Sequence, residues 1–446
     1  MLFLRLLFVA GLAGPAAAWA QPLVWLDKCT NGSFMGLDLA IDYCTRAIKS
    51  GELSNRNLGT AYHNRAMAYF KQGRLDLALR DYDETVRLDE IKGEPPHLRA
   101  ITFFSRANIK MAKRDYDGAL ADFDESIRYD PRPGSTYVGR GQVWLAKRDA
   151  DRALADFSSA LKGDAQASTD KFGGGSVYSR RPKNFDRTDL DSSAYAGRGF
   201  AYVLKNDRTA AMVEFGEAIR IKPNYVPALK GRAQLAELRS DYAAAIADYT
   251  AALHEKPRDA AGYYSRGRAW AALGEYAKSA LDFDAALQVE PQHHAARMSR
   301  GFIAIGEGRY DDAAEQFARV QQGVQPRAYL LLWKHVAQAR SADGQKRGEA
   351  RDELARNSVK LVEQSMHAQI VAFYLGRSDD SALRKPGRNA AEGCEADYFL
   401  AQHHLIGGDK VRGAELLAAI ARQCPATLQE TWAARLELKR LEGSVR

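Results

Sequence analysis

The chain has 446 residues, and its 64 Lys and Arg residues exceed its 56 Asp and Glu residues, which gives a formal net charge of +8. Positive and negative side chains alternate along most of the sequence, whereas a nucleic-acid-binding protein gathers its positive charge on one face. Composition and charge therefore exclude nucleic acid as the expected partner, although they do not distinguish two or three globular domains from a repeat array.

Residues 1–20 have the pattern of an export signal. Arg5 precedes the apolar run Leu6–Leu12, and Ala18-Trp19-Ala20 is a small-x-small cleavage site. The run is shorter than the roughly 20 apolar residues that a membrane-spanning helix needs. Cleavage near Ala20, a periplasmic or secreted location and no stable membrane insertion are therefore expected, with a retained anchor as the alternative.

Residues 21–55 are expected to form a degenerate N-terminal capping repeat. Ala40, Cys44 and Ala47 share one face of a helix, which would be the second helix of this hairpin. Terminal repeats of an array are commonly atypical, because one of their sides has no neighbour.

The four cysteines indicate two disulfides, because an even number of cysteines in an exported chain favours pairing over a metal site or a nucleophile. Cys29 and Cys44 are close in sequence at the start of the helical region. Cys394 and Cys424 lie near the two ends of a helical hairpin predicted at about 394–426, and those ends meet in an antiparallel hairpin. We predict the bonds Cys29–Cys44 and Cys394–Cys424.

A short phrase, in which Arg stands between two small or polar residues, returns seven times within residues 56–325. A small residue follows each Arg by thirteen positions and an aromatic residue lies four positions further on, so each pair shares one face of a helix. The arginines are Arg65, Arg106, Arg140, Arg198, Arg232, Arg266 and Arg300. From Ala211 to Ala313 the small residues recur in steps of 34.

This pattern resembles the tetratricopeptide-repeat family, whose unit is a hairpin of two helices. The resemblance covers the small residue of the first helix and the Pro that closes the second. These positions are Ala66, Ala107, Gly141, Gly199, Ala233, Gly267 and Gly301, and Pro131, Pro223, Pro257 and Pro291. The resemblance implies an all-α fold, an α-solenoid in which helical hairpins stack into a superhelix, followed by a helical C-terminal region.

Two steps between repeats exceed 34 residues, and the excess must lie in loops. The longer one predicts a flexible insert at about residues 164–193, which is rich in Gly, Ser, Asp and Arg. The insert contains Gly173–Gly175 but not the Gly-Lys-Ser/Thr of a phosphate-binding loop, so no phosphate site is expected.

An acidic residue follows six of the seven arginines by sixteen positions, with Gln316 breaking the series. Regular Arg and carboxylate columns in stacked hairpins predict a structural ladder of bidentate pairs. The alternative is a basic groove for a ligand.

The first-helix face that lines the groove in the resembling family is the predicted protein-binding surface. In this sequence it is rich in aromatic and apolar residues, without the recurring Lys and Asn that bind carboxyl-terminal tails, and it suits an extended or helical peptide. The candidates are Phe104, Phe200, Tyr264, Arg268 and Phe302. The alternative is that such residues form the core between neighbouring repeats.

Residues 326–446 are expected to form a helical region that includes the hairpin at 394–426. Short apolar motifs there, such as Asp397-Tyr398-Phe399-Leu400, resemble the C-terminal part of NlpI-type periplasmic adaptor proteins. That resemblance implies an adaptor role in murein-hydrolase or protease regulation.

We predict a non-catalytic periplasmic scaffold that binds proteins or peptides, without cofactor, metal or catalytic residues. The histidine doublets lack partners at ligand spacing. A secretion or outer-membrane assembly factor is the alternative function, and an enzyme using Glu392, Glu395 and Asp397 is the remote one. The sequence leaves homo-oligomerisation and the partner's identity open.

Overall fold

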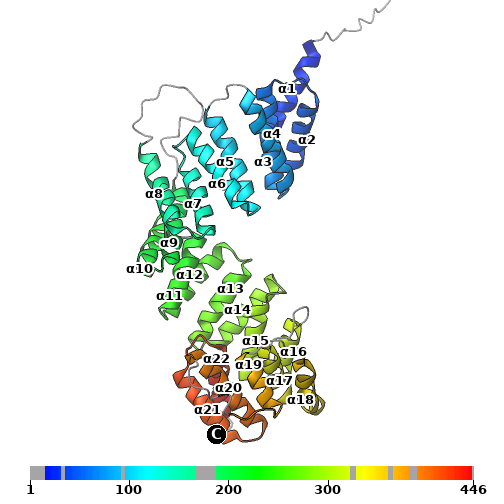
Figure 1. Cartoon of the computed structure of the whole chain (residues 1–446), viewed down its shortest axis with the longest axis vertical. Coiled ribbons are helices and arrows are strands. Elements are labelled where there is room, and N and C mark those ends of the chain that lie inside the picture. The colour runs from blue at the N-terminus through cyan, green and yellow to red at the C-terminus, as the bar shows by residue number, and fades with distance from the viewer. Residues whose placement is uncertain are drawn as a thin grey trace, which may run out of the picture. The chain divides into compact units, whose positions relative to one another are not determined.

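The computed structural model describes residues 16–31, 36–91, 96–166, 187–321, 328–359, 365–380, 383 and 389–443. Within these ranges it contains 22 α-helices and no strand, which confirms the all-α prediction. The chain forms two compact units, Met1–Pro223 and Asn224–Arg446, which Figure 1 colours blue to green and green to red. Residues 1–15 of the predicted export signal lie outside the described residues.

Unit 1 (Met1–Pro223) is a series of helical hairpins in which consecutive helices pack against each other. The hairpins are α1 (Ala16–Asn31) with α2 (Leu37–Lys49), α3 (Asn55–Lys71) with α4 (Leu75–Ile91), α5 (Pro96–Ala112) with α6 (Tyr116–Tyr129), α7 (Gly134–Ala146) with α8 (Ala150–Gln166), and α9 (Thr188–Leu204) with α10 (Arg208–Ile221). The first helices also contact one another, α3 with α5, α5 with α7 and α7 with α9, so they form a row.

The small residues on both sides of the repeated Arg let helices approach closely. A Cβ added at Gly139 would lie 2.7 Å from the ring of Phe123 in the preceding hairpin. One added at Gly141 would lie 3.0 Å from the ring of Phe157 in its own hairpin. The phrase therefore places one small residue against each of two successive aromatic residues, and both aromatic rings are fully buried.

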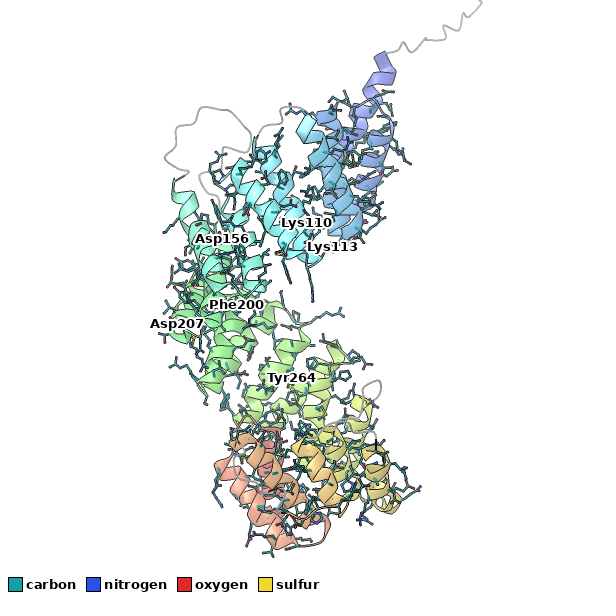
Figure 2. The ribbon with its side chains drawn as sticks, in the orientation of Figure 1. Lys110, Lys113, Asp156, Phe200, Asp207 and Tyr264 are labelled. Carbon is teal, nitrogen blue, oxygen red and sulfur yellow. A yellow bond between two sulfur atoms is a disulfide. The ribbon has the colours of Figure 1, made fainter. Side chains whose placement is uncertain are left out.

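The second helix of several hairpins begins at an aspartate that caps it. Asp115 accepts a hydrogen bond from the backbone N–H of Gly118, and Asp207, labelled in Figure 2, accepts one from that of Ala210. Such caps satisfy one of the backbone donors that a helix leaves free at its first turn.

The predicted insert at about residues 164–193 is shorter than expected. Helix α8 continues to Gln166 and α9 begins at Thr188, so only residues 167–186 are left, and these lie outside the described residues. Asp189 and Asp191 belong to the first turn of α9, where the helix dipole favours negative charge. Polar residues are common in the first turn of a helix as well as in loops, so composition alone does not locate the end of the insert.

The described residues of unit 2 (Asn224–Arg446) form three more repeat hairpins and six further helices. The hairpins are α11 (Val226–Leu238) with α12 (Tyr242–Glu255), α13 (Ala260–Ala272) with α14 (Tyr276–Val289), and α15 (His294–Gly306) with α16 (Tyr310–Gln321). The further helices are α17 (Ala328–Ala339), α18 (Gly344–Ser358), α19 (Met366–Tyr374), α20 (Ala390–Ile406), α21 (Lys410–Gln423) and α22 (Gln429–Gly443).

The last repeat hairpin and the further helices of unit 2 share one apolar core. Trp333 of α17 is fully buried, and its ring lies 4.6 Å from that of Phe302 in α15 and 4.9 Å from that of Tyr398 in α20. The boundary expected near residue 325 therefore separates helices that pack together, and the C-terminal region folds back onto the last repeat.

The structure is compatible with the predicted disulfides. Cys29 is bonded to Cys44, which joins α1 to α2, and Cys394 is bonded to Cys424, which joins the start of α20 to the residue that ends α21. No free cysteine remains among the described residues.

Peptide mapping without reduction should recover the linked pairs Cys29–Cys44 and Cys394–Cys424. Replacing Cys394 and Cys424 with Ser should lower the free energy of unfolding by about 3–4 kcal/mol, because the bond closes a loop across a sequence separation of 30. Crossed pairs or free thiols in protein purified without a reducing agent would contradict the pairing.

Candidate functional site

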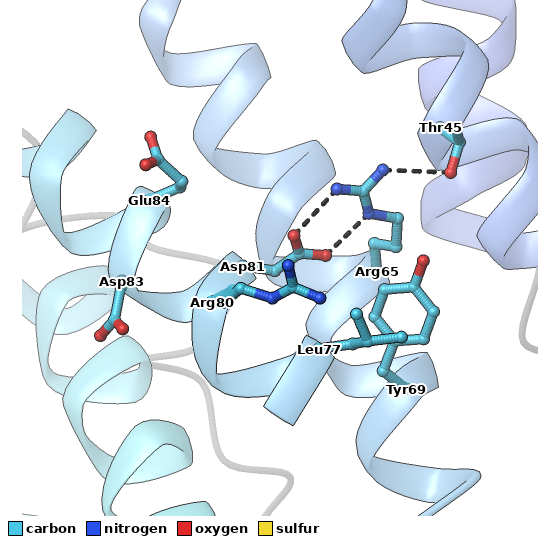
Figure 3. A pocket seen from close by; sticks show the side chains of 8 residues that line it. All are labelled: Thr45, Arg65, Tyr69, Leu77, Arg80, Asp81, Asp83 and Glu84. Carbon is cyan, nitrogen blue, oxygen red and sulfur yellow. Dashed lines mark hydrogen bonds and ion pairs between the residues drawn. The ribbon is translucent and has the colours of Figure 1, made fainter. Parts of the chain in front are cut away.

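The repeated arginines bind the carboxylates that follow them by sixteen positions. In Figure 3, the guanidinium of Arg65 donates two hydrogen bonds to Asp81, from Nε at 2.7 Å and from Nη2 at 2.8 Å. Five further pairs are present: Arg106 with Asp122, Arg140 with Asp156, Arg198 with Glu214, Arg232 with Asp248, and Arg266 with Asp282. The acidic residue of every pair is buried.

Several of these arginines also reach the preceding hairpin. Arg106 donates to Asp83 at 2.9 Å, and Arg266 donates to the hydroxyl of Thr250 at 3.1 Å. Arg300, which has Gln316 in place of the expected carboxylate, pairs only across hairpins in this way, with Asp284 at 2.7 Å. Each such Arg therefore joins its own hairpin to the one before it.

The second partner stands two positions after a carboxylate of the ladder, as Asp83 stands after Asp81 and Thr250 after Asp248. This periodicity is visible in the sequence; the prediction allowed pairs within or between repeats but named only the carboxylates sixteen positions after each Arg. Because the arginines carry structural partners, the geometry supports the ladder and leaves little of their charge for a basic groove.

The predicted anchors Phe104, Phe200 and Tyr264 are partly buried. The ring of Phe104 lies 6.0 Å from that of Phe123, and the ring of Phe200 lies 5.0 Å from that of Phe215. Figure 2 labels Phe200 in unit 1 and Tyr264 in unit 2. Each side chain rests on an aromatic ring of its own hairpin and keeps part of its surface exposed.

Unit 1 exposes additional apolar side chains on the same row of helices. Met67 is 37% exposed, Phe70 39% and Val203 41%. Met67 stands two positions after Arg65, as Phe200 stands two positions after Arg198. Phe70 and Val203 each stand five positions after the Arg of their repeat. We call Met67, Phe70, Phe104, Phe200 and Val203 the inner face of unit 1.

The structure contradicts the prediction that Phe302 is a binding anchor. Phe302 is only 2% exposed, because Trp333 and Tyr329 of α17 pack against its ring. The prediction treated all repeats as equivalent, whereas this one is covered by helices that follow it. We call Tyr264, Arg268, Phe302, Ile305 and Gly306 the inner face of unit 2; within it, Arg268 lies over the ring of Tyr264 at 6.0 Å.

Helix α22 packs against α15 at the inner face of unit 2. Trp432 of α22 is fully buried in a cluster with Phe283 and Ile303, and its indole lies 6.5 Å from the Phe283 ring. Gly306 lies so close to α22 that an added Cβ would be 2.6 Å from the Cβ of Leu436. The last repeat is thus covered by the chain's own C-terminal helix.

A buried carboxylate stands at the start of α22. Glu430 is fully buried and accepts a hydrogen bond from the hydroxyl of Tyr329 at 2.8 Å. Burial, reinforced by the nearby carboxylate of Glu395, raises the pKa of Glu430 to about 7. His367, whose Nε2 lies 2.8 Å from Glu395, opposes this effect.

The remote enzyme hypothesis named Glu392, Glu395 and Asp397. Glu395 lies beside Glu430 and His367, with its side chain partly exposed. The described residues include no group of three or more His, Cys, Asp or Glu side chains that could hold a metal ion. In that part of the chain, no helix is both long enough and apolar enough to span a bilayer.

Stacked hairpins joined by recurring Arg–carboxylate pairs define an α-helical repeat protein. Models of the tetratricopeptide repeat match residues 59–90, 104–168, 230–288 and 272–328. These segments are therefore tetratricopeptide repeats, and they occur in both units.

Solved structures with similar repeats include a tetratricopeptide repeat protein from Parabacteroides merdae. It is 20% identical, the alignment covers 61% of this chain and 94% of that chain, and the TM-score is 0.46. PilF of Pseudomonas aeruginosa is 12% identical over 53% of this chain and 94% of that chain, with a TM-score of 0.41. A search of curated proteins gives no match.

Replacing Arg266 with Ala should lower the free energy of unfolding by about 1–3 kcal/mol, because Asp282 is left buried without its donor. Thermal and urea melts measure this effect, and Arg258→Ala is the control, since Arg258 is exposed. A variant that melts like the wild type but loses a bound partner would favour the basic-groove alternative.

The stability of unit 2 should fall as the pH rises from about 4.5 through about 7. The folded state holds the proton of Glu430 over this range and the unfolded state, with a pKa near 4.5, does not. The loss should reach about 3 kcal/mol above pH 7. Urea melts of Glu430→Gln should lack this component, whereas those of Glu442→Gln, an exposed residue of the same helix, should retain it.

Proposed function

We propose that this chain is a non-catalytic scaffold that binds polypeptide segments on the inner face of unit 1. One observation supports this most directly. At the position two residues after the repeated Arg, Phe302 in unit 2 is 2% exposed, whereas Met67 in unit 1 is 37% exposed. Five residues after the Arg, Ile305 is fully buried and Val203 is 41% exposed. Later helices of this chain cover these two positions in the last repeat of unit 2, whereas they are open at Met67 and Val203 in unit 1.

The chemistry of the inner face of unit 1 suits a peptide with apolar side chains. Met adapts its shape to different partners, and aromatic side chains often dominate interface energies. Part of Phe200 is held in place by Phe215, so little conformational entropy is lost when a partner binds. Because the repeated arginines are already paired with carboxylates, we expect apolar contacts rather than charge to provide most of the affinity.

The finer role that we propose is that of a periplasmic adaptor in the cell envelope, which brings proteins together. Support comes from the export-signal pattern of residues 1–20, from the disulfides and from the resemblance of residues 326–446 to NlpI-type adaptors. A secretion or outer-membrane assembly factor would use the same binding chemistry with a different partner. Affinity capture from a periplasmic extract, followed by mass spectrometry, distinguishes these roles.

Replacing Phe200 with Ala should weaken binding of the captured partner by about 2 kcal/mol, because truncating a rigid aromatic anchor removes buried contact area. Val203→Ala should weaken binding less, and calorimetric titration measures both effects. Val213→Ala is the control, since Val213 is 61% exposed on the second helix α10 and outside the inner face. Thermal melts of each variant separate loss of affinity from loss of folding.

Wild-type affinity in both Phe200→Ala and Val203→Ala would show that the partner does not use this face. The same conclusion would follow if affinity fell only in proportion to the folded fraction.

A further inference from the structure

Helix α22 packs against α15, the first helix of the last repeat, in the manner of a bound peptide, and meets the inner face of unit 2 at Gly306. It comes from the end of the chain, packs along α15 and inserts Trp432 beside Phe283. The cluster that contains Phe302 and Ile305 also contains Ala433 of α22. A face that corresponds in repeat position to the open face of unit 1 is therefore seen with a helix on it.

The contacts of α22 define what the last repeat and the neighbouring helices α17 and α20 recognise. Trp432 fills an apolar site, and Leu436, one helical turn later, lies against Gly306. The next residue, Glu437, is fully buried, where it accepts hydrogen bonds from Arg340 and from Gln402, the latter at 2.7 Å. An aromatic residue, a Leu four positions later and an adjacent carboxylate thus form the recognised pattern.

Some buried polar atoms of α22 have no hydrogen-bond partner. Among the described residues, Oε2 of Glu430, Oγ1 of Thr431 and Nε of Arg440 are buried without a hydrogen-bond partner. Glu430 also faces a second carboxylate, Glu395, with Tyr329 and His367 as the other titratable groups around it. Each of these features costs free energy when α22 docks, because the groups lose water without full compensation.

We propose that the inner face of unit 2 is a second protein-binding surface, and that α22 occupies it as an exchangeable internal ligand. The external ligand is an amphipathic helix with the same pattern of aromatic residue, Leu and carboxylate, but without an acidic residue at the position of Glu430. Such a helix makes the apolar contacts of α22 and reaches Arg340, and it avoids burying the first carboxylate.

This proposal rests on the proposed protein-binding function and adds a second site to it. Its experiments measure the detachment of α22 and the binding of a synthetic peptide to the inner face of unit 2. Their failure would therefore not bear on the inner face of unit 1. Conversely, an inner face of unit 1 that binds nothing would leave these experiments unchanged.

Hydrogen–deuterium exchange of the wild-type chain tests whether α22 detaches. We expect the backbone amides of α22 to exchange at least about 10-fold faster than those of α13 and α15, through an opening that leaves the repeat hairpins protected. Exchange of α22 only together with α13 and α15 would overturn the proposal, because α22 would then be a fixed part of the core.

Fluorescence anisotropy tests the surface itself. The probe is a labelled peptide of residues 425–443 with Glu430→Gln, added to the full chain. We expect it to bind the Trp432→Ala/Leu436→Ala chain at least about 10-fold more tightly than the wild type, whose own α22 competes. Leu436→Ala alone is the milder variant if the double variant does not fold.

Adding Gly306→Val to the Trp432→Ala/Leu436→Ala chain tests whether the peptide binds where α22 packs. The three nearest atoms to a Cβ at Gly306 all belong to α22, so this change blocks the seat of Leu436 and should weaken peptide binding at least about 10-fold. Gly348→Val is the matched control, because a Cβ at Gly348 meets nothing within 4 Å. The proposal would be overturned if the peptide bound equally to the wild type and to the Trp432→Ala/Leu436→Ala chain, or did not bind that chain when it is folded. It would also be overturned if Gly306→Val had no effect on peptide binding.

Discussion

The paired Arg and carboxylate of each repeat is the interaction on which the stacking depends. A guanidinium presents five donors in a fixed plane, so Arg106 can bind Asp122 of its own hairpin through two of them and Asp83 of the preceding hairpin through another. Because Asp122 is buried, the pair cannot separate without leaving a charge that water does not reach. The buried pair therefore holds the two helices of one hairpin together, and the same guanidinium adds a more exposed contact to the preceding hairpin.

Close packing around each Arg depends on the small residues beside it. With Gly139 against Phe123 and Gly141 against Phe157, the first helix of the hairpin lies between two aromatic rings and brings Arg140 within reach of both Asp156 and Asp124. A larger residue at either glycine would push the helices apart and lengthen these hydrogen bonds. The small residues and the Arg of the three-residue phrase thus act together: the small residues allow close packing, and close packing allows the Arg to reach its carboxylates.

Sequence reasoning could predict the parts of the fold that repeat. The spacing of sixteen identified the carboxylates opposite six arginines, because the same two helices meet in the same way each time. It could not predict that Phe302 is buried or that Glu430 and Trp432 are brought to the repeats. The contacts of Glu430 and Trp432 join segments about a hundred or more residues apart, as Tyr329 and Glu430 are at a separation of 101. Like the cover of Phe302 by α17, they occur once, so no periodicity marks them.

The two units show two outcomes for the same repeat surface. An array whose first helices carry apolar side chains must either cover them at its ends or leave them for a partner. In unit 2 the helices after the last repeat cover Phe302 and Ile305, and the buried polar groups of α22 show that this cover is not assembled from apolar contacts alone. In unit 1 no described helix lies over Met67, Phe70 and Val203 closely enough to bury them. An apolar surface that is held in register by an internal ion-pair ladder and stays exposed in unit 1 has the properties of a binding surface rather than of an unfinished core.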